Sequence, residues 1–196
     1  MRAGFLLLCL FAFPFVVFAD ANDGQFMGYD LGASDKEASQ TAEHTATGNL
    51  LVVASSPQKP ADIKQVTLVV TPATRTVGYI SAASWFATEG EARDSARRYV
   101  ELLRAKYPDW SLGREVMDAG SRIVEVSFDK APYNLKLRLV LDTHEGRDMW
   151  RFSMGLGWQP GSKEWQAWQD ISKAEQSARN STEREQLLEN SDVRGL

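Results

Sequence analysis

Hydrophobic and polar residues alternate most regularly between Asn134 and Trp158. The first run carries leucine at every second position, namely Leu135, Leu137, Leu139 and Leu141. After the polar segment THEGR, a second run carries Trp150, Phe152, Met154 and Leu156. A period of two is typical of a strand with one buried face. The pattern therefore predicts a β-hairpin whose inner face belongs to the hydrophobic core.

The same pattern predicts how the two strands pair. With a four-residue loop over Thr143–Gly146, Leu139 faces Trp150 and the other leucines also meet apolar partners. This pairing places Arg138 directly opposite Arg151 on the outer face, although like charges in direct opposition disfavour pairing. We therefore expect an apolar inner face and a cationic outer face.

Shorter runs predict the remaining strands. Apolar and β-branched residues, which favour strands, gather in the segments 49–55, 65–71, 76–81, 110–117 and 122–128. A turn at Pro72–Arg75 joins two of these segments into a hairpin. Its expected pairing places Val70 opposite Val77 and Leu68 opposite Tyr79.

Sequences of the capping-box type mark the starts of two helices. The first, at Ser34, precedes a short helix through about Glu43. The second, at Thr88, precedes a longer helix that ends near Tyr107, because the residue before Pro108 avoids the α region. The apolar residues of this helix form one stripe at helical spacing: Ala92, Ala96, Tyr99, Val100 and Leu103.

These elements predict one α+β domain over residues 22–172. We expect an antiparallel, meander-like sheet of five to seven strands with the long helix packed on it. Short N- and C-terminal helices flank the sheet. The tail, residues 173–196, is polar, and we expect it to be helical or partly disordered.

The first 19 residues predict a secretory signal peptide. One early cation, Arg2, precedes the apolar run Phe5–Phe18, and small residues then offer cleavage after Ala19 or Ala21. An uncleaved anchor is the alternative, but the run is short for a spanning helix and Pro14 interrupts it. Cleavage would remove the single cysteine, which favours the bacterial periplasm, or secretion, as the location. No other segment is long and apolar enough to cross a membrane.

Charge and motifs favour a binding protein over an enzyme. The net charge of −4 argues against nucleic-acid binding, which needs a positive field. Asp142, His144 and Asp148 lie close in sequence and could serve a hydrolase, but polar residues are also usual in exposed turns. Without an HExxH or CxxC pattern, we expect no metal and no cofactor.

The outer face of the predicted hairpin is the main candidate for binding. It carries Lys136, Arg138 and Arg151, and Glu125 of the preceding strand lies beside one of the first two, depending on the register. This face either binds an acidic partner or is an ordinary solvated sheet face. A second candidate is a set of four tryptophans: Trp110, Trp158, Trp165 and Trp168. They form either an aromatic platform for a ligand or an attachment of the C-terminal helix to the sheet.

Export, modest size and the lack of a recognisable catalytic set together favour a periplasmic binding protein. The expected partner is another protein of the cell envelope, with this chain as an inhibitor or immunity factor against a toxin or hydrolase that acts there. An accessory protein for envelope assembly or secretion is the second possibility. The hydrolase is the third.

Overall fold

The computed structural model describes residues 24–34, 42–45, 47–56, 58–113, 116–118 and 123–192. The predicted signal peptide and its cleavage positions lie outside these residues. No helix in the described ranges has both the length and the apolar character that crossing a membrane requires.

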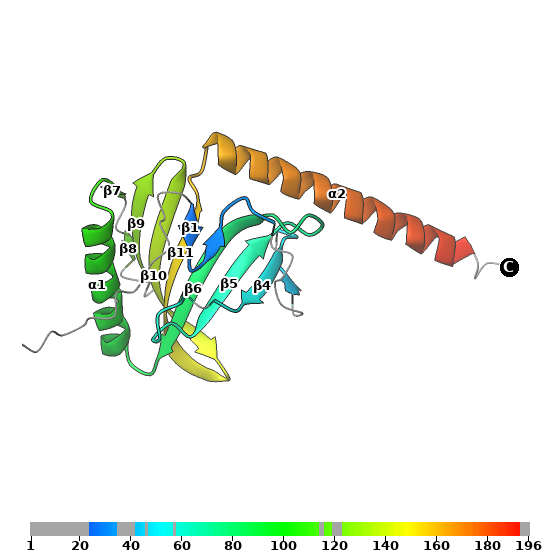
Figure 1. The fold of residues 1–196 in the computed structure, drawn as a ribbon. Helices are drawn as coiled ribbons and strands as arrows, with labels where there is room; N and C mark the ends of the chain where they lie inside the picture. Colours follow the sequence, from blue (N-terminus) through cyan, green and yellow to red (C-terminus); the bar gives the residue numbers. More distant parts are fainter. Residues whose placement is uncertain are drawn as a thin grey trace, which may run out of the picture.

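The described strands form one nine-stranded antiparallel sheet and a separate small hairpin (Figure 1). The sheet contains β3 (Ala42–His44), β4 (Leu50–Ala54), β5 (Gln65–Val70), β6 (Val77–Phe86), β7 (Ser111–Leu112), β8 (Val116–Asp118), β9 (Ile123–Lys130), β10 (Tyr133–His144) and β11 (Arg147–Trp158). The small hairpin pairs β1 (Gln25–Phe26) with β2 (Tyr29–Asp30). Together with the two helices of the described residues, this confirms the predicted α+β class and antiparallel sheet. The two- and three-residue strands β3, β7 and β8 bring the total above the expected five to seven.

The strand order differs from a simple meander. It runs β3-β4-β5-β6-β11-β10-β9-β7, and β8 also pairs with β9. Two meanders, β3 to β6 and β9 to β11, therefore meet where β6 pairs with the last strand, β11. This long pairing joins Phe86–Tyr79 to Trp150–Gly157 and makes β6 and β11 the centre of the sheet.

The predicted N-terminal helix lies mostly outside the described residues. Its described ends are not helical. Ser34 forms an isolated β-bridge with Thr76, and its hydroxyl donates to the Thr74 carbonyl. At the other end, residues 42–44 form strand β3 beside β4.

The β10–β11 hairpin has a tighter turn than predicted. Only Glu145 and Gly146 form the loop, and both have positive φ angles of 51° and 75°. Positive φ at both loop residues is typical of a two-residue hairpin turn. Leu139 consequently faces Phe152, not Trp150. The register differs from the prediction by two residues, and because a strand repeats every two residues, each side chain stays on its predicted face.

The β5–β6 hairpin confirms one predicted pair and corrects the other. Val70 faces Val77 as expected. Leu68 faces Ile80, not Tyr79, because the register shifts by one residue next to Val70. This irregularity places Tyr79 on the outer face of the sheet.

Helix α1 (Glu89–Lys106) covers the inner face of β6, β10 and β11. The predicted capping box is present, since Thr88 and Glu91 exchange side-chain and backbone hydrogen bonds. Within the predicted stripe, Tyr99 is buried and its ring stacks on Phe152 of β11, with ring centroids 5.3 Å apart. Burial and a hydrogen bond to Asp62 raise the pKa of Tyr99, so this phenol remains a neutral donor.

Helix α2 (Lys163–Asp192) is a 30-residue helix, not the short one predicted. Its first half attaches to the strand ends: the Trp168 indole N–H donates to the Thr76 carbonyl at 3.3 Å, and the Ser172 hydroxyl donates to Asn49 at 2.8 Å. Residues 177–187 are all exposed, and this part projects away from the sheet (Figure 1). The expected boundary between residues 172 and 173 thus lies inside one continuous helix.

Glu175 of α2 closes the turn between β5 and β6. Its carboxylate accepts hydrogen bonds from the Ala73 amide at 2.7 Å and from the Thr74 hydroxyl at 2.6 Å. Partial burial alone would raise the pKa of Glu175, but the hydrogen bonds outweigh burial and hold this pKa below its ordinary value. The carboxylate therefore stabilises the attachment of α2 in its charged form.

Replacing Glu175 with glutamine is expected to lower the melting temperature at pH 7, and this difference should shrink in acid. A carboxylate with a lowered folded-state pKa stabilises the fold above its unfolded-state pKa, about 4.3, and loses that contribution as the pH falls through the folded-state value. Thermal denaturation from pH 7 to about pH 3 measures the difference. Glu185→Gln, on the exposed part of α2, is the matched control. Equal effects of the two substitutions would contradict the role of Glu175.

Candidate functional site

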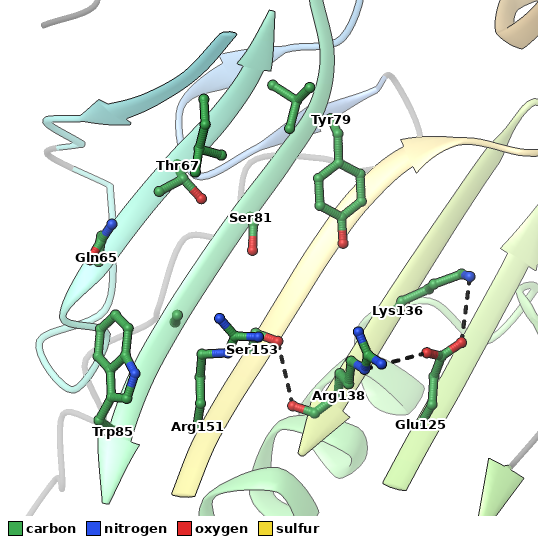
Figure 2. Close-up of a pocket in the computed structure, with 13 residues that line it drawn as sticks. Gln65, Thr67, Tyr79, Ser81, Trp85, Glu125, Lys136, Arg138, Arg151 and Ser153 are labelled. Carbon is green, nitrogen blue, oxygen red and sulfur yellow. Dashed lines mark hydrogen bonds and ion pairs between the residues drawn. The ribbon is translucent and has the colours of Figure 1, made fainter. Parts of the chain in front are cut away.

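A pocket of about 420 Å³ lies on the face of the sheet opposite α1 (Figure 2). We call it the outer-face pocket. Strands β9, β10 and β11 supply its charged side chains, and β5 and β6 supply hydroxyl, amide and aromatic groups. The charged group consists of Glu125, Lys136, Arg138 and Arg151. The other group includes Gln65, Thr67, Tyr79, Ser81 and Trp85.

The structure brings all four residues of the predicted cationic face into this pocket. It does not place the two arginines opposite each other. Arg138 faces Ser153, whereas Arg151 faces Val140, because of the shorter hairpin turn. The prediction that the two arginines lie directly opposite each other is therefore wrong. They occupy diagonal positions on the same face of the sheet.

Carboxylates partly neutralise the cations of the pocket. Glu125 lies 3.4 Å from the Lys136 ammonium and 4.0 Å from the Arg138 Nε. Asp142 lies 3.0 Å from an Arg151 Nη. The set thus holds three cations and two carboxylates, with Glu125 shared. The Nε atom of Arg151 is buried without a hydrogen-bond partner among the described residues.

Tyr79 divides the outer face into two parts, and two glycines make its position possible. A Cβ atom on Gly155 would lie 1.8 Å from the Tyr79 hydroxyl oxygen, and one on Gly157 would lie 2.8 Å from its ring. Burial, and next the charge of Glu125, raise the pKa of Tyr79 to about 12, while the nearby arginines act in the opposite direction. The hydroxyl is therefore a neutral donor at physiological pH. Sequence reasoning missed Tyr79, because the predicted β5–β6 pairing placed it opposite the buried Leu68.

A second hollow, of about 320 Å³, adjoins the first. We call it the aromatic pocket. Its main lining residues are Trp158, Trp165, Trp168 and Pro160, and it shares Tyr79 and Lys136 with the outer-face pocket. Trp168 also attaches α2 to the sheet, as one of the two alternatives for the tryptophans predicted.

Trp110 does not belong to the aromatic pocket. It is buried in the hydrophobic core, and its ring lies 5.2 Å from that of Tyr107 at the end of α1. The expected four-tryptophan platform is therefore reduced to three members.

The cluster considered for a hydrolase is divided by the hairpin. Asp142 and His144 lie on the outer face, whereas Asp148 faces Thr143 on the alternate set of positions. The His144 ring stacks on Trp85, with centroids 4.0 Å apart, at the end of the outer-face pocket. Within the described ranges, no group of three His, Cys, Asp or Glu side chains could hold a metal ion.

The outer face offers guanidinium, ammonium and hydroxyl donors beside aromatic surfaces. Arginine forms paired, charge-assisted hydrogen bonds with carboxylates, and aromatic rings bind apolar groups. This arrangement suits recognition of a ligand with acidic and apolar parts. Comparisons with protein-family models, with curated proteins and with solved structures found no match to this chain.

Proposed function

We propose that the protein is an exported binding protein whose outer-face pocket engages an acidic protein of the cell envelope. In this role it acts as an inhibitor or immunity factor against a toxin or hydrolase that works there. The observation that carries the proposal is the gathering of Lys136, Arg138 and Arg151 in one hollow of an otherwise acidic chain. Export rests on the signal-peptide pattern of the first 19 residues.

The charges of the pocket support this proposal physically. Glu125 and Asp142 hold the three cations in place, yet one positive charge is left over. A carboxylate of the partner would complete that balance. Complementary charge of this kind raises the association rate and selects the partner.

Reversing two of the charges tests the proposal. The double variant Arg138→Glu/Arg151→Glu is expected to bind the partner at least about tenfold more weakly, because two attractive contacts become repulsive. The partner is first captured from an envelope extract on immobilised wild-type protein and identified by mass spectrometry. Its affinity for each variant is then measured by titration.

A matched control separates the site from net charge. Arg97→Glu/Arg104→Glu makes the same charge change on the exposed side of α1, on the opposite face of the sheet. This control should retain wild-type affinity. Circular dichroism and melting temperatures establish that both variants fold. Unchanged affinity of the Arg138/Arg151 variant, or equal loss in the two variants, would overturn the proposal.

An accessory role in envelope assembly or secretion is the second candidate function. It is supported by the exposed residues 177–187 of α2, which give the protein a second surface away from the outer-face pocket. Shortening the chain before residue 177 should leave the partner affinity of the pocket unchanged and abolish assembly if this role applies. An effect on pocket affinity would instead place α2 in the same interface.

A further inference from the structure

The outer-face pocket and the aromatic pocket adjoin each other, and we refer to the two together as the groove. Tyr79 and Lys136 line both. Along β6, every second residue from Tyr79 to Trp85 belongs to the outer-face pocket. The six residue steps from Tyr79 to Trp85 cover about 20 Å, and the aromatic pocket extends the groove beyond Tyr79. The groove therefore has the length of an extended peptide segment of roughly six to eight residues.

The two ends of this groove have different chemistry. Arg138 and Arg151 provide cationic donors in the outer-face pocket, as Figure 2 shows. Trp165 and Trp168 provide an apolar, aromatic surface at the other end. A ligand that fills the whole groove must carry an acidic group and an apolar group at separate positions.

The middle of the groove is lined by small side chains. Ser153 and Ala83 lie in the same row of the sheet as Arg138, and Ser81 lies in the row of Lys136. Short side chains leave space for a backbone to approach the sheet surface, and the serine hydroxyls can donate to or accept from peptide groups. The neutral Tyr79 hydroxyl adds a donor where the two pockets meet.

We infer that the partner binds through an extended segment with an acidic side chain at Arg138 and Arg151 and an aromatic side chain or proline in the aromatic pocket. This inference rests on the proposed function and specifies the chemistry of its partner. Charge complementarity supports it: three cations of the outer-face pocket pair with two carboxylates, Glu125 and Asp142, which leaves one positive charge for an acidic side chain of the partner. An extended segment matches the length of the groove and both of its ends.

A peptide library tests this inference with a defined probe. Phage-displayed random peptides of about twelve residues, long enough to span the roughly 20 Å groove when extended, are selected on the full-length protein. Phage that also bind the Arg138→Glu/Arg151→Glu variant are removed. The selected peptides should share an Asp or Glu and an aromatic residue or proline at a constant spacing.

Fluorescence polarisation with a labelled peptide of the selected type then assigns each end of the groove. Arg138→Glu/Arg151→Glu and Trp165→Ala should each weaken binding at least about tenfold, whereas Arg97→Glu/Arg104→Glu should not. Replacing the acidic residue of the peptide with its amide should remove the effect of the arginine substitutions. Melting temperatures exclude unfolding of the Trp165→Ala variant.

The outcomes separate this inference from the proposed function. If the envelope partner depends on Arg138 and Arg151 but no peptide is enriched, the partner presents a folded surface, and the extended-segment inference fails alone. Peptides without an acidic residue, or peptides that bind Trp165→Ala normally, also overturn the inference. If the affinities of the partner and of the peptide are both unchanged by the arginine substitutions, both proposals fail.

Discussion

Replacing Phe152 with alanine is expected to lower the free energy of unfolding by about 3–5 kcal/mol. Phe152 is fully buried on the inner face of β11, and its ring stacks on Tyr99 of α1. The substitution removes apolar contacts and leaves a cavity between the helix and the centre of the sheet. Urea denaturation followed by circular dichroism measures the change, and the α1 signal should be lost in the same transition as the sheet signal.

The neighbouring residue provides the control for this prediction. Ser153 follows Phe152 on the same strand but lies on the outer face, in the outer-face pocket. Ser153→Ala should change the free energy of unfolding by no more than about 0.5 kcal/mol, because it removes no core contact. Similar effects at the two positions would contradict the assignment of inner and outer faces.

Replacing Gly155 with valine is expected to lower the free energy of unfolding by about 1–3 kcal/mol and to weaken partner binding. Strand propensity alone predicts the opposite sign, since valine favours strands and glycine does not. The Tyr79 ring decides the outcome, because its hydroxyl oxygen lies 1.8 Å from the position of the new Cβ atom. The ring must leave the boundary between the two pockets. Denaturation measures the stability, and titration measures the affinity.

A double variant tests whether the Tyr79 ring causes the loss of stability in Gly155→Val. Shortening Tyr79 to alanine removes the obstructing ring, so Gly155→Val should cost much less stability in a Tyr79→Ala background than in the wild type. Partner affinity should remain low in the double variant, because the hydroxyl donor and the aromatic wall are both absent. Stabilisation by Gly155→Val in the wild-type background would show that Tyr79 does not lie over this glycine.

Local patterns were sufficient to identify the faces of the central strands and the start of α1. Alternation in β10 and β11 assigns Leu137 and Phe152 to the core and Arg138 and Arg151 to the opposite face. A register shift by an even number of residues does not change this assignment. The Thr88–Glu91 capping box, also predicted from neighbouring residues, is present at the start of α1. Both signals depend on residues a few positions apart, where chain connectivity holds the partners together.

The register itself was not predicted, because it depends on the backbone of one turn. Glu145 adopts a positive φ angle, which is uncommon for this residue, and so Glu145-Gly146 forms a two-residue loop. Sequence patterns alone allow a four-residue loop with equally matched apolar pairs. The tighter turn moved Arg138 away from Arg151 and placed it opposite Ser153.

The sequence by itself determined the class of fold, the two faces of the central hairpin and the residues that make its outer face cationic. Only the tertiary structure decided that β6 pairs with β11, that Tyr79 lies over Gly155, and that Trp110 is separated from the other tryptophans. Periodicity is a local property of the chain and reports which way a side chain points. Contacts between residues far apart in the sequence, such as Phe86 with Trp150 or Tyr79 with Gly157, depend instead on how the whole chain balances burial, registers and close packing. This balance places the outer-face pocket and the aromatic pocket side by side.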